Sequence, residues 1–406
     1  SALNNIITVV GEGHIIQKID VLAKGTYNHT ESEDFLQKSF DDHFKGRSFN
    51  IIHSFVVITR TGVTKGKIKN DVLEDFKSKI YKVVQTLESG RFNPTLLREK
   101  QLDNLYYRVA TMDFVSKGII LDNFSPSKNY IEVGEKIAKS ISLVDIDRID
   151  LPEKVVPFTS NGGGALKNFP MDTMHFLHNV PHYDTIIYNQ VVEIPNQMRT
   201  TQKLQLKQKR HSGIPDPEND ICVEDIERLL TDVARENQML VKAHFNIIVS
   251  AENEALLKKA VNFIDNSLFI QGIYPSRNTY NQLELFRSAL PGNAVELKDY
   301  DLFLTTSDAA LCYFFKEALP ISEPSPKGFK IRFTDRQGIP ISIDPADYSK
   351  DIGRINNRNK FILGPSGCGK SFFMNYLVEQ YLMYNMHVEI VDTGDSYHGQ
   401  IHCKKG

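Results

Sequence analysis

The residues most suited to chemistry lie near the C-terminus, where the octet GPSGCGKS occupies positions 364 to 371. Its spacing fits the G-x-x-x-x-G-K-[ST] pattern of a phosphate-binding loop. The glycines allow positive φ and leave room for phosphate oxygens beside backbone N–H groups. We expect the Lys370 ammonium to reach the β- and γ-phosphates of a nucleotide and the Ser371 hydroxyl to ligate Mg²⁺. The candidate nucleotide-binding residues are Gly364, Pro365, Ser366, Gly367, Cys368, Gly369, Lys370 and Ser371.

The sequence around the octet indicates the elements that a phosphate loop needs. KFILG before it is typical of a short buried strand, and SFFMNYLVEQYLMY after it predicts an amphipathic helix. The apolar face of that helix is expected to contain Phe373, Tyr376, Leu377 and Tyr381. A strand, a glycine-rich turn and a helix place the loop at the positive end of the helix dipole. The alternative is a glycine-rich turn without a ligand.

Acidic residues follow the next predicted strand, HVEIVD at 387–392. Asp392 and Asp395 emerge where open α/β sheets bind ligands, so one of them is a candidate for contact with the nucleotide or a metal-bound water. The alternative is that they cap the turn. No acidic strand follows in this sequence, so no hydrolytic base is assigned, and we expect binding without hydrolysis.

Composition narrows the class of protein. The chain has 406 residues, 41% hydrophobic and 24% charged, with a net charge of −2, which gives no overall attraction to nucleic acid or anionic lipid. Four scattered cysteines indicate reduced thiols in the cytoplasm and no disulfide framework. No apolar run approaches the roughly 18 residues of a membrane span. The absence of an initiator Met suggests a piece cut from a longer protein.

Two further clusters are weaker candidates. His175, His178 and His182 lie close to Asp184, but Pro181 interrupts the helix that would present them together, which favours a solvated loop over a zinc site. A basic stretch without interleaved aromatic residues favours a solvated helix face over a surface for nucleic acid or membrane. That stretch contains Lys203, Lys207, Lys209, Arg210 and His211.

Periodicity and turn residues divide the chain into elements. Strands are expected at 14–23, 49–62, 185–194, 239–251 and 268–274, with a hairpin at 330–344. Helices are expected at 31–44, 70–89, 93–108, 221–237 and 252–267, with a basic helix ending near Gly213. Residues 239–274 would then form a β-α-β step, and residues 150–185 a loop or subdomain crossing. The predicted domains are 1–155 and 156–318, both α+β, a linker at 319–328, and a nucleotide domain at 329–406.

The stretch GRINNRNKFILGPSGCGKSFFMNYLVEQY, followed by IVDTGDSYHG, closely resembles the TraG-type ATPases of conjugative transposons. These are related to the large ATPases of type IV secretion and conjugation systems. Looser similarity extends upstream through HFKGRSFNIIHSFVVITR at 43–60 and KGFKIRFTDRQGIPISIDP.

The resemblance implies a RecA-like or AAA-like P-loop motor that uses ATP and Mg²⁺, forms a hexamer and lies in the cytoplasm at the inner membrane. Its expected partners are the conjugation or secretion channel proteins. Its expected function is to energise pilus assembly, protein transfer or, indirectly, DNA transfer. By this comparison the chain holds an α+β N-terminal region and the truncated start of the motor domain, without the second acidic motif, sensors or arginine finger. The alternatives are an interaction scaffold without chemistry and another P-loop nucleotide-binding protein, such as a small kinase.

Overall fold

The structure is a computed structural model that describes residues 2–27, 35–62, 69–90, 92–116, 118, 123–127, 129–143, 172–213, 216–236, 238–276, 280–315, 329–334, 340–394 and 397. Its contacts divide the chain into two compact units, Ser1–Ala318 and Leu319–Gly406. The expected linker at 319–328 lies outside the described residues, as do Asp395 and most of the loop-rich segment 150–185.

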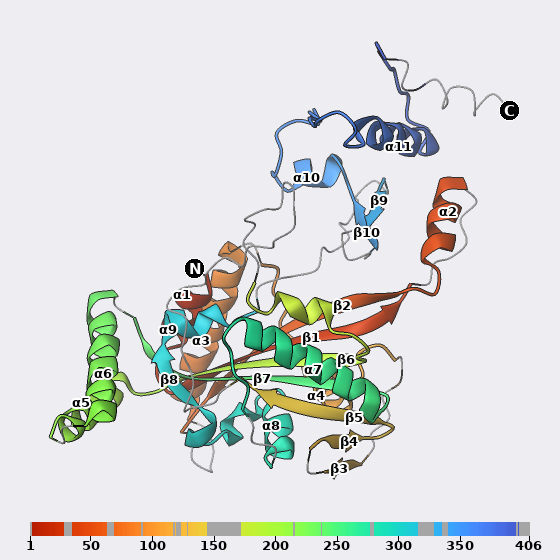
Figure 1. Cartoon of the computed structure of the whole chain (residues 1–406). Helices are drawn as coiled ribbons and strands as arrows, with labels where there is room; N and C mark the ends of the chain where they lie inside the picture. Colours follow the sequence, from red (N-terminus) through yellow and green to blue (C-terminus); the bar gives the residue numbers. More distant parts are fainter. Residues whose placement is uncertain are drawn as a thin grey trace. The chain divides into compact units, whose positions relative to one another are not determined.

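A single antiparallel sheet organises the N-terminal unit (Figure 1). Its strands are β1 (His14–Thr26), β2 (Ser48–Arg60), β3 (Phe124–Pro126), β4 (Ile131–Val133), β5 (Lys136–Ser142), β6 (Thr185–Ile194), β7 (Leu240–Ala251) and β8 (Phe303–Thr306). The order is β2-β1-β6-β7-β5-β4-β3, and β8 pairs with one end of β7. Every strand pairing among the described residues is antiparallel, so the fold is mixed α/β without the β-α-β steps that we expected.

Helices cover both faces of this sheet. They are α1 (Ala2–Val10), α2 (Phe35–Phe44), α3 (Asn70–Ser89), α4 (Glu99–Thr111), α5 (Gln197–His211), α6 (Pro217–Glu236), α7 (Glu254–Ile270), α8 (Gln282–Ser288) and α9 (Ser307–Cys312). The described residues also form the short 3-10 helices η1 (His175–Asn179), η2 (Asn293–Glu296) and η3 (Asp299–Asp301). One buried cluster packs α1, α7, α9 and η1 against the sheet, and a second packs α4 and α8 on the other face.

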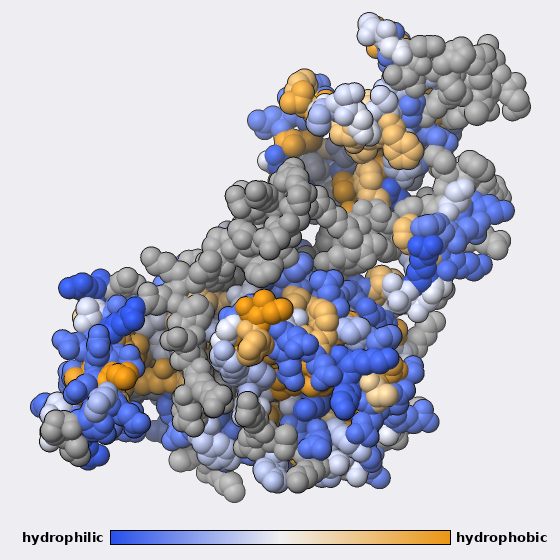
Figure 2. Space-filling view, in the orientation of Figure 1, coloured by the Kyte–Doolittle hydropathy of each residue, from blue (hydrophilic) through white to orange (hydrophobic). Residues whose placement is uncertain are grey.

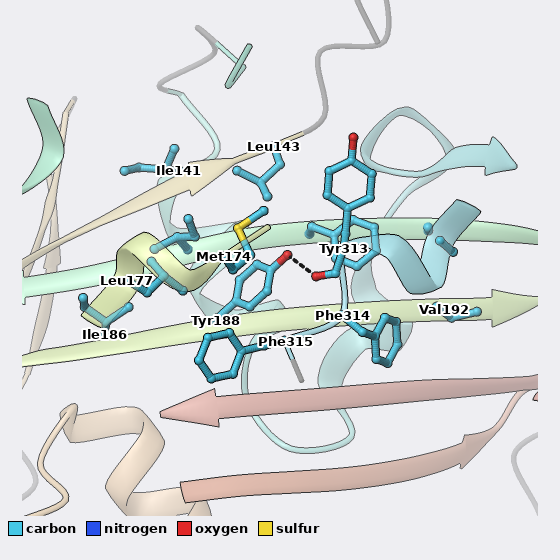
Figure 3. Close-up of a cluster of buried hydrophobic side chains, with 14 of the residues drawn as sticks. Ile141, Leu143, Met174, Leu177, Ile186, Tyr188, Val192, Tyr313, Phe314 and Phe315 are labelled. Carbon is cyan, nitrogen blue, oxygen red and sulfur yellow. Dashed lines mark hydrogen bonds between the residues drawn. The ribbon is translucent and has the colours of Figure 1, made fainter. Parts of the chain in front are cut away.

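The centre of the larger cluster is aromatic (Figure 3). The Tyr188 ring from β6 lies 6.4 Å from the Phe245 ring of β7, and Tyr313 approaches Phe245 to 5.3 Å. The buried Tyr188 hydroxyl donates a hydrogen bond of 2.8 Å to the Tyr313 carbonyl. Burial raises the pKa of Tyr188, so the hydroxyl keeps the proton that this hydrogen bond requires. The segment after α9 is thereby fixed to the middle of the sheet.

Segments that we expected in separate subdomains share this sheet. Strand β1 from the first segment pairs along ten residues with β6 from the second, from His14 opposite Ile194 to Ala23 opposite Thr185. Both strands are almost entirely buried, so neither segment has an apolar face that it could bury alone. Residues 1–318 therefore form one structural unit, in which the segments before and after residue 155 complete each other.

The predicted strand at 268–274 is wrong, because α7 continues to Ile270. Leu268 is fully buried and extends the helical stripe of Ile264 and Val261, which keeps the chain helical. The helix ends where Gly272, with φ +74°, reverses the chain and Ile273 donates to the Leu268 carbonyl at 3.0 Å. The remaining strand predictions for this unit are confirmed, whereas the helix expected from residue 93 begins only at Glu99.

The C-terminal unit is built from four described elements. They are β9 (Ile331–Thr334), β10 (Pro340–Ile343), α10 (Asp347–Asp351) and α11 (Lys370–Met383). The antiparallel pairing of β9 with β10 confirms the predicted hairpin. The buried residues Phe329, Ile331 and Leu377 form the centre of its core. None of the described helices in either unit is long and apolar enough to cross a membrane.

Candidate nucleotide-binding site

The last two residues of the octet, Lys370 and Ser371, are the first two residues of helix α11. Gly369 precedes the helix with φ +90°, and Gly367 has φ +79°. Both values lie in the left-handed region that only glycine adopts without strain. The Cys368 N–H donates to the Pro365 carbonyl at 3.4 Å, so these four residues make a turn in which the third position needs positive φ. The two glycines thus turn the chain sharply into the helix.

Gly364 has a different role from the one we expected, because its φ is not positive. A Cβ at this position would lie 2.5 Å from Cys368 Sγ and 3.6 Å from the Lys370 side chain. The missing side chain therefore permits the two ends of the loop to approach each other. The loop needs Gly364 for close packing and the other two glycines for backbone conformation.

The Lys370 ammonium lies across the loop. Its Nζ donates to the Pro365 carbonyl at 2.7 Å and lies 3.9 Å from Cys368 Sγ. An ammonium group has three N–H donors, so at least one remains for an anion while both contacts are kept. The octet pattern contains Pro365 only as a variable position, and no sequence signal pointed to its carbonyl as the partner of Lys370.

The first turn of α11 supplies further donors. The leading N–H groups of a helix have no intrahelical acceptor, and the helix dipole makes this end positive. Lys370 and Ser371 are the first two residues of the helix, and Ser371 is exposed. An anion at the loop would meet backbone N–H groups, an ammonium and a hydroxyl on one short segment. These residues fit the phosphates of a nucleotide, and Ser371 offers the hydroxyl ligand for Mg²⁺.

Packing against the hairpin fixes the helix that carries these donors. The Phe373 ring stacks on Phe333 of β9 at 6.0 Å, and Tyr381 stacks on Phe329 at 5.1 Å. The Tyr376 hydroxyl donates to the Arg332 carbonyl at 2.7 Å, and burial raises the pKa of this tyrosine. The predicted apolar face of the helix is confirmed, because Phe373, Tyr376, Leu377 and Tyr381 all belong to the core.

The strands predicted on either side of the loop and helix are absent from the described residues. Residues 360–364 and 387–392 have no strand pairing, and Phe361, Leu363 and Val391 are 88%, 84% and 99% exposed. A strand needs a neighbour for its backbone groups, and β9 and β10 pair only with each other. The Asp392 carboxylate accepts the Gly394 N–H at 3.0 Å, as in the capped turn that we weighed as the alternative.

The structure places the two weaker candidates, the histidine cluster and the basic stretch, in different surroundings. His178 lies in η1 with 6% exposure and packs against Phe315 at 5.7 Å, so the expectation of a solvated loop is wrong there. The described residues contain no cluster of acidic, histidine or cysteine side chains able to hold a metal ion. The basic stretch lies on α5, which has no buried residue, as expected for a solvated helix.

Family comparisons agree with this division of the chain. Residues 330–406 match the family model of the TraG P-loop domain. Residues 183–295, which run from β6 to η2, match the CagE, TrbE, VirB family, described as a component of the type IV transporter system. A comparison with curated proteins gave no match. Each structural unit carries one such match, and together the two matches support the resemblance to the TraG-type conjugation ATPases of type IV transporter systems.

Proposed function

We propose that the octet binds the triphosphate of ATP with Mg²⁺ and that the protein uses the nucleotide to energise transfer through a conjugation channel. The observation that carries this proposal is the start of α11, where Gly369 at φ +90° brings the Lys370 ammonium and the first N–H groups of the helix to one place. This arrangement suits a multiply charged anion.

Each residue of the site has a defined task. Gly367 and Gly369 shape the loop, and Gly364 lets its ends meet. Lys370 places a positive charge at the phosphates, and Ser371 offers its hydroxyl to the metal ion. Bound Mg²⁺ would supply charge neutralisation at the β- and γ-phosphates. Asp392 is assigned to the turn and is the weakest member of the set.

The working location and partners in this proposal rest on the family resemblance. We expect a cytoplasmic protein held at the inner membrane by channel proteins, acting as a homo-oligomer in pilus assembly or in DNA or protein transfer. A RecA-like arrangement would require segments 360–364 and 387–392 to pair as parallel strands. Their exposed side chains Phe361, Leu363 and Val391 are suited to such pairing.

ATP binding to the chain tests this proposal. Lys370→Ala should weaken ATP affinity at least about tenfold, because a charge-assisted hydrogen bond to phosphate contributes about 1.5–3 kcal/mol. Lys360→Ala is the matched control, since this lysine is ten residues upstream and bonds only the nearby Arg358 carbonyl at 3.4 Å. Unfolding curves without nucleotide should coincide for the two variants. Equal ATP affinity in both variants would leave the scaffold alternative as the better account.

A further inference from the structure

Helices α5 and α6 form a hairpin that stands apart from the sheet (Figure 1). No residue of α5 is buried, and the buried Ile226 is the most enclosed residue of α6. The surface of this hairpin is mainly hydrophilic in the view of Figure 2. The hairpin therefore contributes little to the sheet core, and its outer side chains are available to a partner.

A basic stripe follows one side of α5. We define it as Arg199, Lys203, Lys207 and Arg210, which are four, four and three residues apart and all exposed. This spacing places the four side chains on one side of a helix. Helix α5 contains no acidic residue that would neutralise them.

An acidic stripe follows one side of α6. We define it as Asp220, Glu224 and Glu227, which are four and three residues apart and also exposed. The helix carries its apolar residues elsewhere, at the half-buried Val223 and Leu230 on either side of Ile226. The acidic stripe is thus separate from the face that packs within the hairpin.

The two stripes make few charge contacts within the described part of the chain: the pKa of the Asp299 carboxyl is lowered mainly by Lys242 and to a smaller degree by Lys203 of the basic stripe. No ion pair there includes a side chain of the basic or the acidic stripe. The two helices contact each other, and both have residues that are at least half-buried, such as Leu204 of α5 and Ile226 of α6. Charged rows that do not stabilise their own hairpin are suited to contact with another molecule.

We propose that the basic stripe of one chain docks on the acidic stripe of a second copy of the same chain. The two rows have similar spacing and opposite charge, and each copy supplies both of them. A polyanion would satisfy the basic stripe but would be repelled by the acidic one, and the net charge of −2 gives it no general attraction. The contact joins unlike surfaces, so it is heterologous and propagates from copy to copy. It is independent of the phosphate loop.

Self-association of the 406-residue chain tests this proposal. Sedimentation equilibrium should show association at about 20 mM salt that is lost near about 500 mM, because screening shortens the range of exposed charges. Lys203→Glu with Lys207→Glu should weaken association at least about tenfold, and Glu224→Lys with Glu227→Lys should do the same. The chain with all four substitutions reverses the charge at the two middle positions of the basic stripe and at two positions of the acidic stripe, so opposite charges face each other again at these positions and association should be partly restored.

Lys209→Glu is the matched control, since Lys209 lies two residues from Lys207 on the opposite side of α5 and should leave association unchanged. Circular dichroism of each variant checks that the hairpin remains helical. The proposal is overturned if the wild-type chain stays monomeric at low salt, or if stripe variants associate as the wild type does. A monomer that binds vesicles of anionic lipid through Lys203 and Lys207 would assign the basic stripe to a membrane and also overturn it.

Discussion

In the N-terminal unit, the central strands β6 and β7 bury nearly every side chain, with neighbours on both edges and helices on both faces. In the C-terminal unit, the apolar segments beside the phosphate loop leave Phe361, Leu363 and Val391 between 84% and 99% exposed. The two regions contain the same kind of apolar run. They differ in whether the described residues supply a neighbouring strand for it.

This contrast separates two roles. The N-terminal unit is a packed scaffold whose stability depends on burial, whereas the C-terminal unit presents donors at the end of one helix. That helix is held by a small core around Phe329, Ile331 and Leu377. We therefore expect substitutions in the first unit to change mainly stability and substitutions in the second to change mainly nucleotide affinity.

The largest expected effect is the loss of a ring from the N-terminal core. Phe245→Ala should lower the free energy of unfolding by about 3–5 kcal/mol, because it leaves a cavity beside Tyr188, Tyr313 and Phe314. Phe372→Ala removes the same ring from a site that is 81% exposed and should change stability by less than about 0.5 kcal/mol. Urea unfolding of both variants measures the two changes in the free energy of unfolding. Similar losses in the two would contradict the contrast between a packed and an exposed region.

A smaller effect is expected in the phosphate loop. Gly369→Ala forces a side chain into φ +90°, which costs about 1–2 kcal/mol and should lower ATP affinity about tenfold or more by distorting the loop. Gly353→Ala is the control, because φ there is +70° with open space around it and it lies outside the octet. Both variants should lose similar stability, but only the first should lose affinity. Equal ATP binding by the two would show that the loop geometry is not what the site requires.

The smallest effect concerns pH and the buried His244. Its Nδ1 donates to the Asp301 carbonyl at 2.7 Å, and burial lowers the pKa of the imidazole below its usual 6.5. The unfolded chain therefore binds a proton more readily, so stability is retained above pH 6.5 and falls as the pH drops below it. The slope is at most about 1.4 kcal/mol per pH unit for this group.

His244→Gln should flatten the pH dependence of unfolding between about pH 6.5 and pH 5. His387→Gln is the control in the C-terminal unit, where the side chain is 88% exposed and the substitution should leave stability unchanged. Unfolding by urea at several pH values measures both. An unaltered slope in the His244 variant would show that its burial does not set the pH dependence of the scaffold.

Local patterns predicted much of the fold but not its pairing. The apolar runs at 185–194 and 239–251 predicted β6 and β7, and the stripe in 70–89 predicted α3. The run at 268–274 has the same local appearance, yet the burial of Leu268 against the sheet keeps it in α7. That β1 would also pair with β6 depends on contacts between residues more than a hundred positions apart, which no local pattern reports.

The sequence predicted which residues form the candidate site, but only part of their arrangement in space. The positive φ at Gly367 and Gly369 and the start of the helix at Lys370 follow from the octet. The close approach at Gly364 and the Lys370 contact with the Pro365 carbonyl depend on how the loop folds back on itself. Segments 360–364 and 387–392 can form strands only where neighbouring strands pair with them. Their apolar sequence alone was therefore not enough to predict strands there.

The most direct test of the central claim is a titration of the chain with ATP, ADP, AMP and adenosine, with and without Mg²⁺. If the octet captures phosphate, affinity should decrease as phosphates are removed, adenosine should not bind measurably, and Mg²⁺ should strengthen binding of ATP. In Lys370→Ala the differences between ATP, ADP and AMP should become small, because the ammonium at the loop is gone. Adenosine binding as tight as that of ATP, or a phosphate dependence that survives Lys370→Ala, would contradict the assignment of this loop.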